Sequence, residues 1–484
     1  MSVPRTILVG LAVLVLAAVC APGVAAPPAE TEQIVKIRLH PMPETRPALK
    51  YQLLPPFLER RPGNAAVWWN RIPADQARFF TDLDKKGRLG EKIEKWMEIP
   101  LGDPREKQFR DQEPEIAGLG RNVLFSDMDY AARFESCDWQ LAIREGRFVE
   151  MRIPDVSQTR TFARLLAAKA HLEIAEGNYD QAVRTFQTGF ALAVHVARGQ
   201  TLIHGLVGTA VAALAANQVE QFIQQPGAPN LYWALAMLPR PLVDYRPGLE
   251  GEMNSFYLNF PELKDLDKKQ LSAEGWRELM AKVVGLFWHV ASDTPAKPAS
   301  GMAVLLALQG YPGAKQYLID HGRTAAEVEA MPVAQVVLLY EVQIYQELND
   351  DVFKNLFLPY SEGQKGTAEV EAKLRQGISR RLEIFPIAAL MLPAVAAAKS
   401  SETRGQWFLA RLQILEALRI YAAAHDGRLP DRLSDIREVP IPTNPYNDKP
   451  FEYRRDGSRA ILTSTPAGLP VRYEITMAAQ GDKR

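Results

Sequence analysis

The stretch that decides the fold reads ARLLAAKAHLEIA (163–175), EGN (176–178) and YDQAVRTFQTGFALA (179–193). Apolar residues recur every three or four positions in the first and third segments, which predicts two amphipathic helices. Gly177 is suited to end the first helix, because glycine readily adopts the left-handed conformation of a C-terminal cap. The small side chains of Ala168, Ala175 and Ala182 allow the two helices to approach each other closely. The stretch therefore predicts a helical hairpin.

Residues 162–197 resemble one tetratricopeptide unit, in which small side chains let two helices pack and larger ones fill the groove between them. Tyr179 and Phe186 are the expected groove-filling residues. A second copy at a period of 34 residues is not found, so we expect the chain to continue by further helices. The next of these, Leu202 to Phe222, is predicted to be a buried helix with polar residues inside it.

The N-terminus has the pattern of a secretory signal peptide over residues 1–26. Arg5 supplies a positive charge, Ile7 to Val19 form an apolar core, and small residues lead to a cleavage site near Ala25 or Ala26. Two alternatives stay open, namely a lipoprotein signal that uses Cys20 and an uncleaved N-terminal membrane anchor. Either way the sequence predicts export to the periplasm or cell envelope.

The charges balance, with 57 basic and 57 acidic residues, and removal of the signal takes only Arg5 from the basic set. A neutral chain has no long-range attraction to nucleic acid, so we expect no nucleic-acid partner. Cys137 is the only cysteine after the signal, which leaves no internal disulfide. We expect its side chain to be buried as a small hydrophobic group.

The rest of the chain divides by composition. Residues 27–80 predict a proline-rich extended lead-in with a strand at 34–39. The segment 48–55 either pairs with this strand as a hairpin or lies along the helical body. A helical domain over 81–292 and a second helical region over 301–400 follow, with 293–300 as the linker between them. The first helix is expected to start at Ala74 with Asp75 as its N-cap.

The C-terminal region, 401–484, predicts a helix and a small antiparallel sheet. Trp407 to Ala424 carries an amphipathic stripe, 451–454 and 460–463 flank an Asp456-Gly457 turn, and 471–477 supplies a third strand. Taken together, the pattern predicts a mainly α fold of tetratricopeptide-like hairpins and further packed helices, with a small C-terminal α+β module.

Two further resemblances cover longer stretches. The phrases ALKYQLLP (48–55), PGNAA (62–66), ESCDW (135–139), GFALA (189–193) and NLYWALAMLPRP (230–241) resemble an uncharacterised family of secreted planctomycete-type proteins. The phrases ALRIY (417–421), HDGRLP (425–430) and NPYNDKPFEY (444–453) resemble the globular part of a type II secretion major pseudopilin. The first resemblance implies export and a helical body, and the second implies a helix followed by a sheet.

Local motifs for catalysis and metal binding are missing from the sequence. The histidines lack metalloprotease spacing, and nucleophile-elbow, P-loop and dinucleotide motifs do not occur. His195 and His204 are predicted to be core or surface histidines. The stretch 82–87 resembles a calcium loop but has Lys86 at a ligand position. We therefore predict no cofactor and no metal.

One enzyme alternative remains, an extracytoplasmic hydrolase with a carboxylate and histidine site between the helices near 130 and 170. Its catalytic residues would be Glu135, Asp138, His171 and Glu173, provided that the helices bring them together.

The favoured interpretation is a non-enzymatic scaffold that binds another envelope protein or a peptide, with no membrane span in the mature chain. Packed helix pairs leave a concave face that is free for such contacts. Four aromatic residues are candidates for exposed contacts, although core packing is the expected role of each: Tyr179, Tyr232, Trp233 and Trp407.

Overall fold

The computed structural model describes residues 33–83, 89–145, 155–292, 300–380, 393–464 and 471–478, together with Phe148, Met151 and Ile153. It has two compact units. The larger unit contains the described residues within Ala29–Leu141, Arg152–Gly248 and Ser400–Arg484, and the smaller unit contains those within Ala142–Met151 and Leu249–Lys399. The predicted fold class is confirmed, because the chain is mainly helical with a small C-terminal antiparallel sheet of strands β4 to β6.

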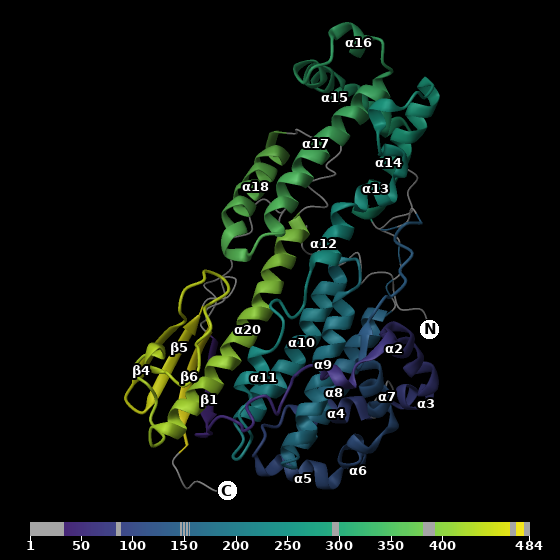
Figure 1. The fold of residues 1–484 in the computed structure, drawn as a ribbon. Helices are drawn as coiled ribbons and strands as arrows, with labels where there is room; N and C mark the ends of the chain where they lie inside the picture. The colour runs from purple at the N-terminus through teal and green to yellow at the C-terminus, as the bar shows by residue number, and fades with distance from the viewer. Residues whose placement is uncertain are drawn as a thin grey trace. The chain divides into compact units, whose positions relative to one another are not determined.

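The predicted helical hairpin forms the centre of the larger unit (Figure 1). Helices α8 (Asp155–Ala175) and α9 (Tyr179–Ala197) are joined at Gly177, which has a φ of +72°. Helix α10 (Leu202–Ile223) packs against both. The Phe222 ring of α10 meets the rings of Tyr179 and Phe186 edge-on, with centroids 5.2 and 5.6 Å away. The predicted groove-filling residues therefore pack against a third helix.

Helix α10 is the one helix of the described chain that is long and apolar enough to cross a membrane by length and composition. Most of its apolar window, 61%, is buried inside the protein, as the sequence predicted for a core helix.

The proline-rich lead-in differs from the prediction in two ways. Strand β1 (Gln33–Leu39) exists, but it pairs in parallel with β6 (Val471–Met477). Of the two alternatives for 48–55, the second is confirmed, because Tyr51 and Gln52 hydrogen-bond to side chains of α9. Helix then begins well before residue 80, at α2 (Ala65–Asp75). The Asn64 side chain accepts the Ala66 N–H as the N-cap, whereas Asp75 is the last residue of the helix. Pro73 lies inside this helix, where a proline removes a backbone hydrogen bond, so local sequence rules alone disfavour helix here.

Short elements complete the helical part of the larger unit. They are α3 (Ala77–Leu83), α4 (Leu89–Met97), α5 (Pro104–Gln112), α6 (Pro114–Ala117), α7 (Val123–Ala132), α11 (Tyr232–Ala236) and a parallel pair of strands, β2 (Arg61–Asn64) and β3 (Phe134–Ser136). The 3-10 turns η1 (Phe57–Glu59) and η2 (Leu119–Arg121) connect them. Trp69 and Trp96 are completely buried and fill the space between these elements and the hairpin.

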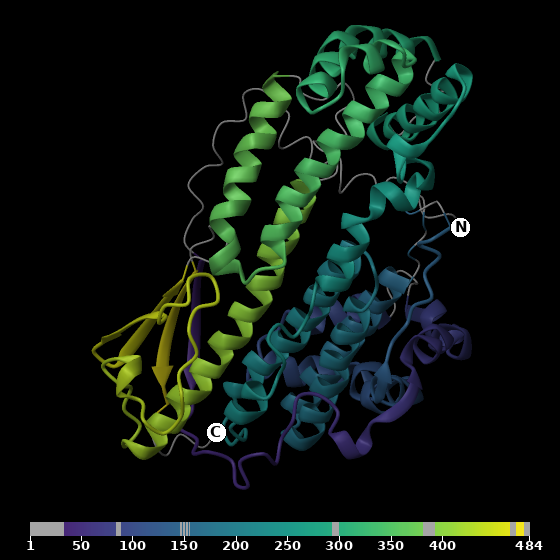
Figure 2. The same ribbon diagram turned by 45° about the horizontal axis from the view of Figure 1, so that its top comes forward.

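The C-terminal sheet has four strands in the order β1-β6-β5-β4, with β4 (Glu452–Asp456) and β5 (Arg459–Ser464) as the predicted hairpin. Figure 2 shows the strands as one layer beside the C-terminal half of α20 (Pro393–Ala424). The guanidinium of Arg411 on α20 lies 4.3 Å from the centroid of the Tyr473 ring on β6. The third predicted strand is confirmed, and the N-terminal strand adds a fourth.

A buried ion pair on α20 connects distant parts of the larger unit. Glu416 and Arg419 have no exposed side-chain surface, and their charged atoms lie 2.9 Å apart. Glu416 accepts hydrogen bonds from the side chain of Asn230 and from the Leu231 N–H. Arg419 donates to the carbonyl oxygens of His40 and Ala228. The pair therefore holds both the lead-in and the 228–231 segment against α20.

The smaller unit consists of helices around α17 (Val333–Leu356). Its elements are the end of α12 (Arg246–Met253), α13 (Ser255–Asn259), η3 (Pro261–Leu263), η4 (Leu266–Lys268), α14 (Ala273–Ser292), α15 (Ser300–Asp320), α16 (Ala325–Glu329) and α18 (Tyr360–Arg380). Helix α17 packs against α14, α15 and α18, and its Tyr345 ring lies 4.4 Å from that of Phe256. The predicted signal peptide, 1–26, and most of the predicted linker, 293–299, lie outside the described residues.

Replacing Gly208 with alanine is expected to destabilise the larger unit by about 1–3 kcal/mol, because the new Cβ would lie 2.9 Å from the Ala193 carbonyl oxygen of α9. This loss outweighs the gain of about 1 kcal/mol in helix propensity. Gly313→Ala in α15 is the matched control, since its Cβ would meet nothing within 4 Å. Scanning calorimetry should show a lower transition temperature for the first variant only; equal transitions would contradict this packing.

Replacing Glu416 with alanine should lower the free energy of unfolding of the larger unit by about 3–5 kcal/mol, because Arg419 would remain buried without its carboxylate. The double variant Glu416→Leu, Arg419→Met should recover much of this loss, since both charges are then removed. Urea unfolding monitored by circular dichroism measures the free energy of unfolding of both variants. A single variant as stable as the wild type would exclude this role for the pair.

Candidate functional site

The four residues of the hydrolase alternative lie in three separate environments. Glu135 and Asp138 are exposed, on β3 and just after it. The Asp138 carboxylate accepts the backbone N–H of Gln140, and the backbone of Asp138 pairs with the Asn64 side chain. Both residues therefore belong to a surface turn.

His171 is buried against the Trp96 ring, with the two ring centroids 4.8 Å apart. Burial lowers the pKa of its imidazole, while the nearby charge of Glu106 acts in the opposite direction. Glu106 itself accepts the Trp96 indole N–H at 2.9 Å and pairs with Arg110 at 3.2 Å. His171 is therefore enclosed by helices α4, α5 and α10.

Glu173 points away from His171, as expected for residues two apart on one helix. It pairs with Lys169 of the same helix and accepts the Thr185 hydroxyl of α9 at 2.6 Å. No hydrogen bond or ion pair within the described part of the chain joins any two of Glu135, Asp138, His171 and Glu173. The packing of the helices near 130 and 170 thus does not assemble the predicted set.

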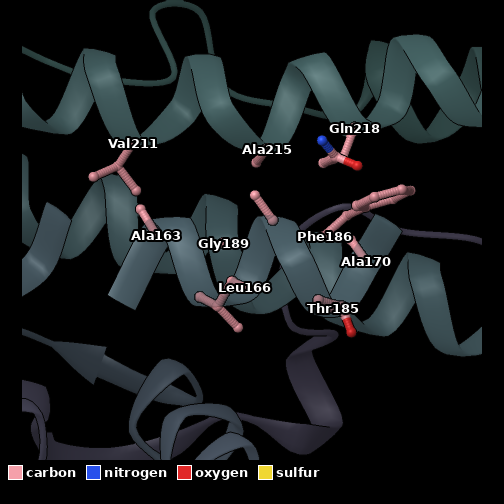
Figure 3. Close-up of a pocket in the computed structure, with 10 residues that line it drawn as sticks. Ala163, Leu166, Ala170, Thr185, Phe186, Gly189, Val211, Ala215 and Gln218 are labelled. Atoms are coloured by element: carbon pink, nitrogen blue, oxygen red, sulfur yellow. The ribbon is translucent and has the colours of Figure 1, made fainter. Parts of the chain in front are cut away.

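The cavity nearest to this region lies between α8, α9 and α10 (Figure 3). Its walls are mostly small apolar side chains, with Thr185 and Gln218 as the polar exceptions. Its volume of about 10 Å³ is roughly the space of one water molecule. A substrate does not fit there.

His195 and His204, for which the sequence predicts a core or surface position, are both buried in the core. The Trp69 indole N–H donates to Nδ1 of His195 at 3.1 Å, and Nε2 lies 3.0 Å from the Phe134 carbonyl oxygen. Since Nδ1 accepts, the proton is on Nε2, and the ring is neutral. His204 contacts the Thr201 hydroxyl at 2.7 Å. Among the described residues no group of His, Cys, Asp or Glu is placed to hold a metal ion.

The remaining candidates also have structural roles. Asp129 binds Arg133 and Arg184 at 2.7 and 2.9 Å, and Cys137 is buried as predicted. Tyr232 and Trp407 are buried, as core packing predicted, while Tyr179 and Trp233 are half-buried. The calcium-like stretch 82–87 lies largely outside the described residues, because 84–88 are not described.

A larger pocket lies along α20 within the larger unit, and the sequence did not predict it. We call it the α20 pocket. Its inner chamber, of about 90 Å³, lies between α10 and α20. Thr209, Ala212, Ala213 and Ala216 form one stripe of α10 at intervals of three and four residues. Leu242, Val243, Phe408 and Leu409 complete the apolar walls, and the remaining lining residues of α20 are Glu402, Arg404, Gly405 and Gln406. The chamber exists because the α10 side chains facing it are small.

The mouth of the α20 pocket, of about 170 Å³, adjoins the chamber and shares Leu242, Gln406 and Leu409 with it. The loop after α11 and the proline-rich loop before β4 form its other walls. Their residues include Pro239, Arg240, Pro442, Thr443, Pro445 and Asp448. The mouth is therefore a mixed polar and apolar surface beside an apolar chamber.

A hydrogen-bond chain fixes Arg240 at the mouth. The Arg240 guanidinium donates a hydrogen bond to the side-chain carbonyl oxygen of Gln413 at 2.9 Å. Gln413 is buried and also hydrogen-bonds to Tyr232, whose hydroxyl donates to the Pro440 carbonyl oxygen. Burial raises the pKa of the Tyr232 phenol, so it stays a neutral donor. Two buried side chains therefore orient an exposed cation.

Arg240 and Asp448 are both exposed, and neither has an ion-pair partner within the described residues. Other exposed charged side chains of the larger unit form pairs, such as Arg184 with Asp129, or have no ion-pair partner in the described part of the chain, as is the case for Arg246. The mouth thus presents one unpaired positive and one unpaired negative group next to hydrogen-bonding side chains. The sequence signal for this site is the PRP phrase at 239–241, which by itself indicates only a break between helices.

Comparison with protein-family models, curated proteins and solved structures gives no match to this chain. The resemblances to tetratricopeptide, planctomycete-type secreted and pseudopilin families therefore stay predictions.

Acidification from pH 8 to pH 5 should destabilise the larger unit through its buried histidines. Burial lowers the pKa of His195, and likewise that of His204, to about 4. Between pH 6.5 and 4 the unfolded chain binds more protons than the folded one, so stability falls as the pH falls. The expected loss at pH 5 is about 2 kcal/mol for each histidine.

Urea unfolding monitored by tryptophan fluorescence at the two pH values measures this effect. His204→Asn should reduce the difference between pH 8 and pH 5, because the imidazole that gains a proton on unfolding is then absent. If His204→Asn keeps the full pH dependence of the wild type, the buried imidazole of His204 is not a cause of the loss of stability.

Proposed function

We propose that this chain is an exported protein of the cell envelope that binds a peptide segment of a partner protein and does not catalyse a reaction. The observation that carries this function is the α20 pocket. It combines an apolar chamber with a mouth that offers a fixed guanidinium, a carboxylate and amide side chains. Sites of this kind bury an apolar group and orient it with a few polar contacts.

A polypeptide suits the mouth better than a compact apolar ligand does. Gln406 and Thr443 line it, and these side chains are able to exchange hydrogen bonds with peptide N–H and C=O groups. The prolines around them lack N–H donors and leave flat apolar surface. Export and the cell-envelope location rest on the predicted signal peptide at 1–26, and the near-neutral charge favours a protein partner over nucleic acid.

Enrichment of a phage-displayed peptide library on the immobilised mature chain tests this function. We expect enriched peptides with a shared apolar position from the wild type. Ala213→Phe should abolish the enrichment, because Ala213 lines the inner chamber and a phenyl ring at this position would block it.

Ala424→Phe is the matched control, since Ala424 is exposed on the last turn of α20 and does not line the pocket. Circular dichroism should show the same helix content for all three proteins. Identical enrichment by the wild type and Ala213→Phe would rule out the pocket as the binding site.

A further inference from the structure

The α20 pocket places a fixed positive charge close to a small apolar chamber, and this combination restricts the ligand. Leu242 lines both the chamber and the mouth, and Arg240 of the mouth is only two residues before it. A ligand that uses both features must therefore carry an anionic group and an aliphatic group a short distance apart.

We propose, on the basis of the proposed peptide-binding function, that the α20 pocket recognises the free C-terminus of a polypeptide ending in a short aliphatic residue. In such a residue the α-carboxylate and the side chain are attached to the same Cα atom. The carboxylate pairs with Arg240 while the side chain enters the inner chamber. An internal acidic residue separates its carboxylate from a neighbouring apolar side chain, because consecutive side chains of an extended peptide point to opposite sides.

The geometry of Arg240 favours a carboxylate. A guanidinium has five N–H donors in a planar fork, and the hydrogen bond to Gln413 uses one of them. The others remain for two-point binding of a carboxylate, which is the strongest type of charged hydrogen bond in proteins. Because Gln413 and Tyr232 are buried, the guanidinium is already oriented before the ligand arrives.

The size of the chamber selects the side chain. Its volume of about 90 Å³ is smaller than the cavity of about 150 Å³ that accepts benzene in a lysozyme variant. An aliphatic group of about three or four carbons, as in valine or leucine, therefore fits, whereas an aromatic ring does not. The unpaired Asp448 at the mouth favours a peptide with a basic residue upstream of its end.

Isothermal titration calorimetry of the mature chain with N-acetyl-Lys-Ala-Ala-Val tests this assignment. We expect the free acid to bind about tenfold more tightly than the C-terminal amide, because the amide lacks the charge that pairs with Arg240. Arg240→Gln should weaken binding of the acid to the level of the amide and leave binding of the amide unchanged.

Arg246→Gln is the matched control, as Arg246 is an exposed arginine that does not line the pocket. Ala213→Val, which narrows the chamber, should shift preference from C-terminal valine to C-terminal alanine. This exchange of specificity is not expected from a merely unstable variant.

Equal affinities of the acid and the amide would overturn C-terminal recognition and leave peptide binding intact. Free valine that binds as tightly as the peptide would overturn the assignment to a polypeptide end. Absence of binding by either peptide form, together with no enrichment from the peptide library, would remove the proposed function as well.

Discussion

The buried ion pair between Glu416 and Arg419 is the constraint on which the larger unit depends. A charge without solvent contact needs a partner and hydrogen bonds for its remaining atoms. The backbone of His40, Ala228 and Leu231 and the side chain of Asn230 supply those bonds. Because these groups come from segments far apart in the sequence, the requirement of one helix for polar partners determines where both segments lie.

The same helix determines the α20 pocket. Gln406, Leu409 and Gln413 are spaced by three and four residues and form one face of α20 toward the pocket. The ion pair one turn further along anchors 228–231, and the chain then enters α11 and the loop that carries Arg240. Arg240 is therefore held in two places. Its guanidinium bonds to Gln413 on α20, and its backbone belongs to a loop that begins at the ion pair. Groups that hold the fold together and groups that line the pocket therefore alternate along a single helix.

Local patterns were enough to predict the helices and the C-terminal hairpin, because helix periodicity and a Gly457 turn act over a few residues. They could not predict that β1 pairs with β6, since Ile37 and Thr476 are 439 residues apart. The α2 helix contains Pro73, which local rules disfavour inside a helix, so its presence depends on packing. The separation of His171 from Glu173 follows from helix geometry, whereas the α20 pocket requires four segments that only tertiary packing brings together.

The small side chains of α10 set the size of the inner chamber. Larger side chains at Ala212, Ala213 or Ala216 would fill it. A Cβ added at Gly405 of α20 would lie 3.5 Å from the Thr209 side chain of α10, so the two helices already approach to van der Waals distance at this point. In the proposed complex, the apolar area that a peptide side chain would bury against these alanines contributes to affinity at about 25 cal/mol for each Å². The same three alanines would therefore determine both which side chain fits and how much its burial contributes.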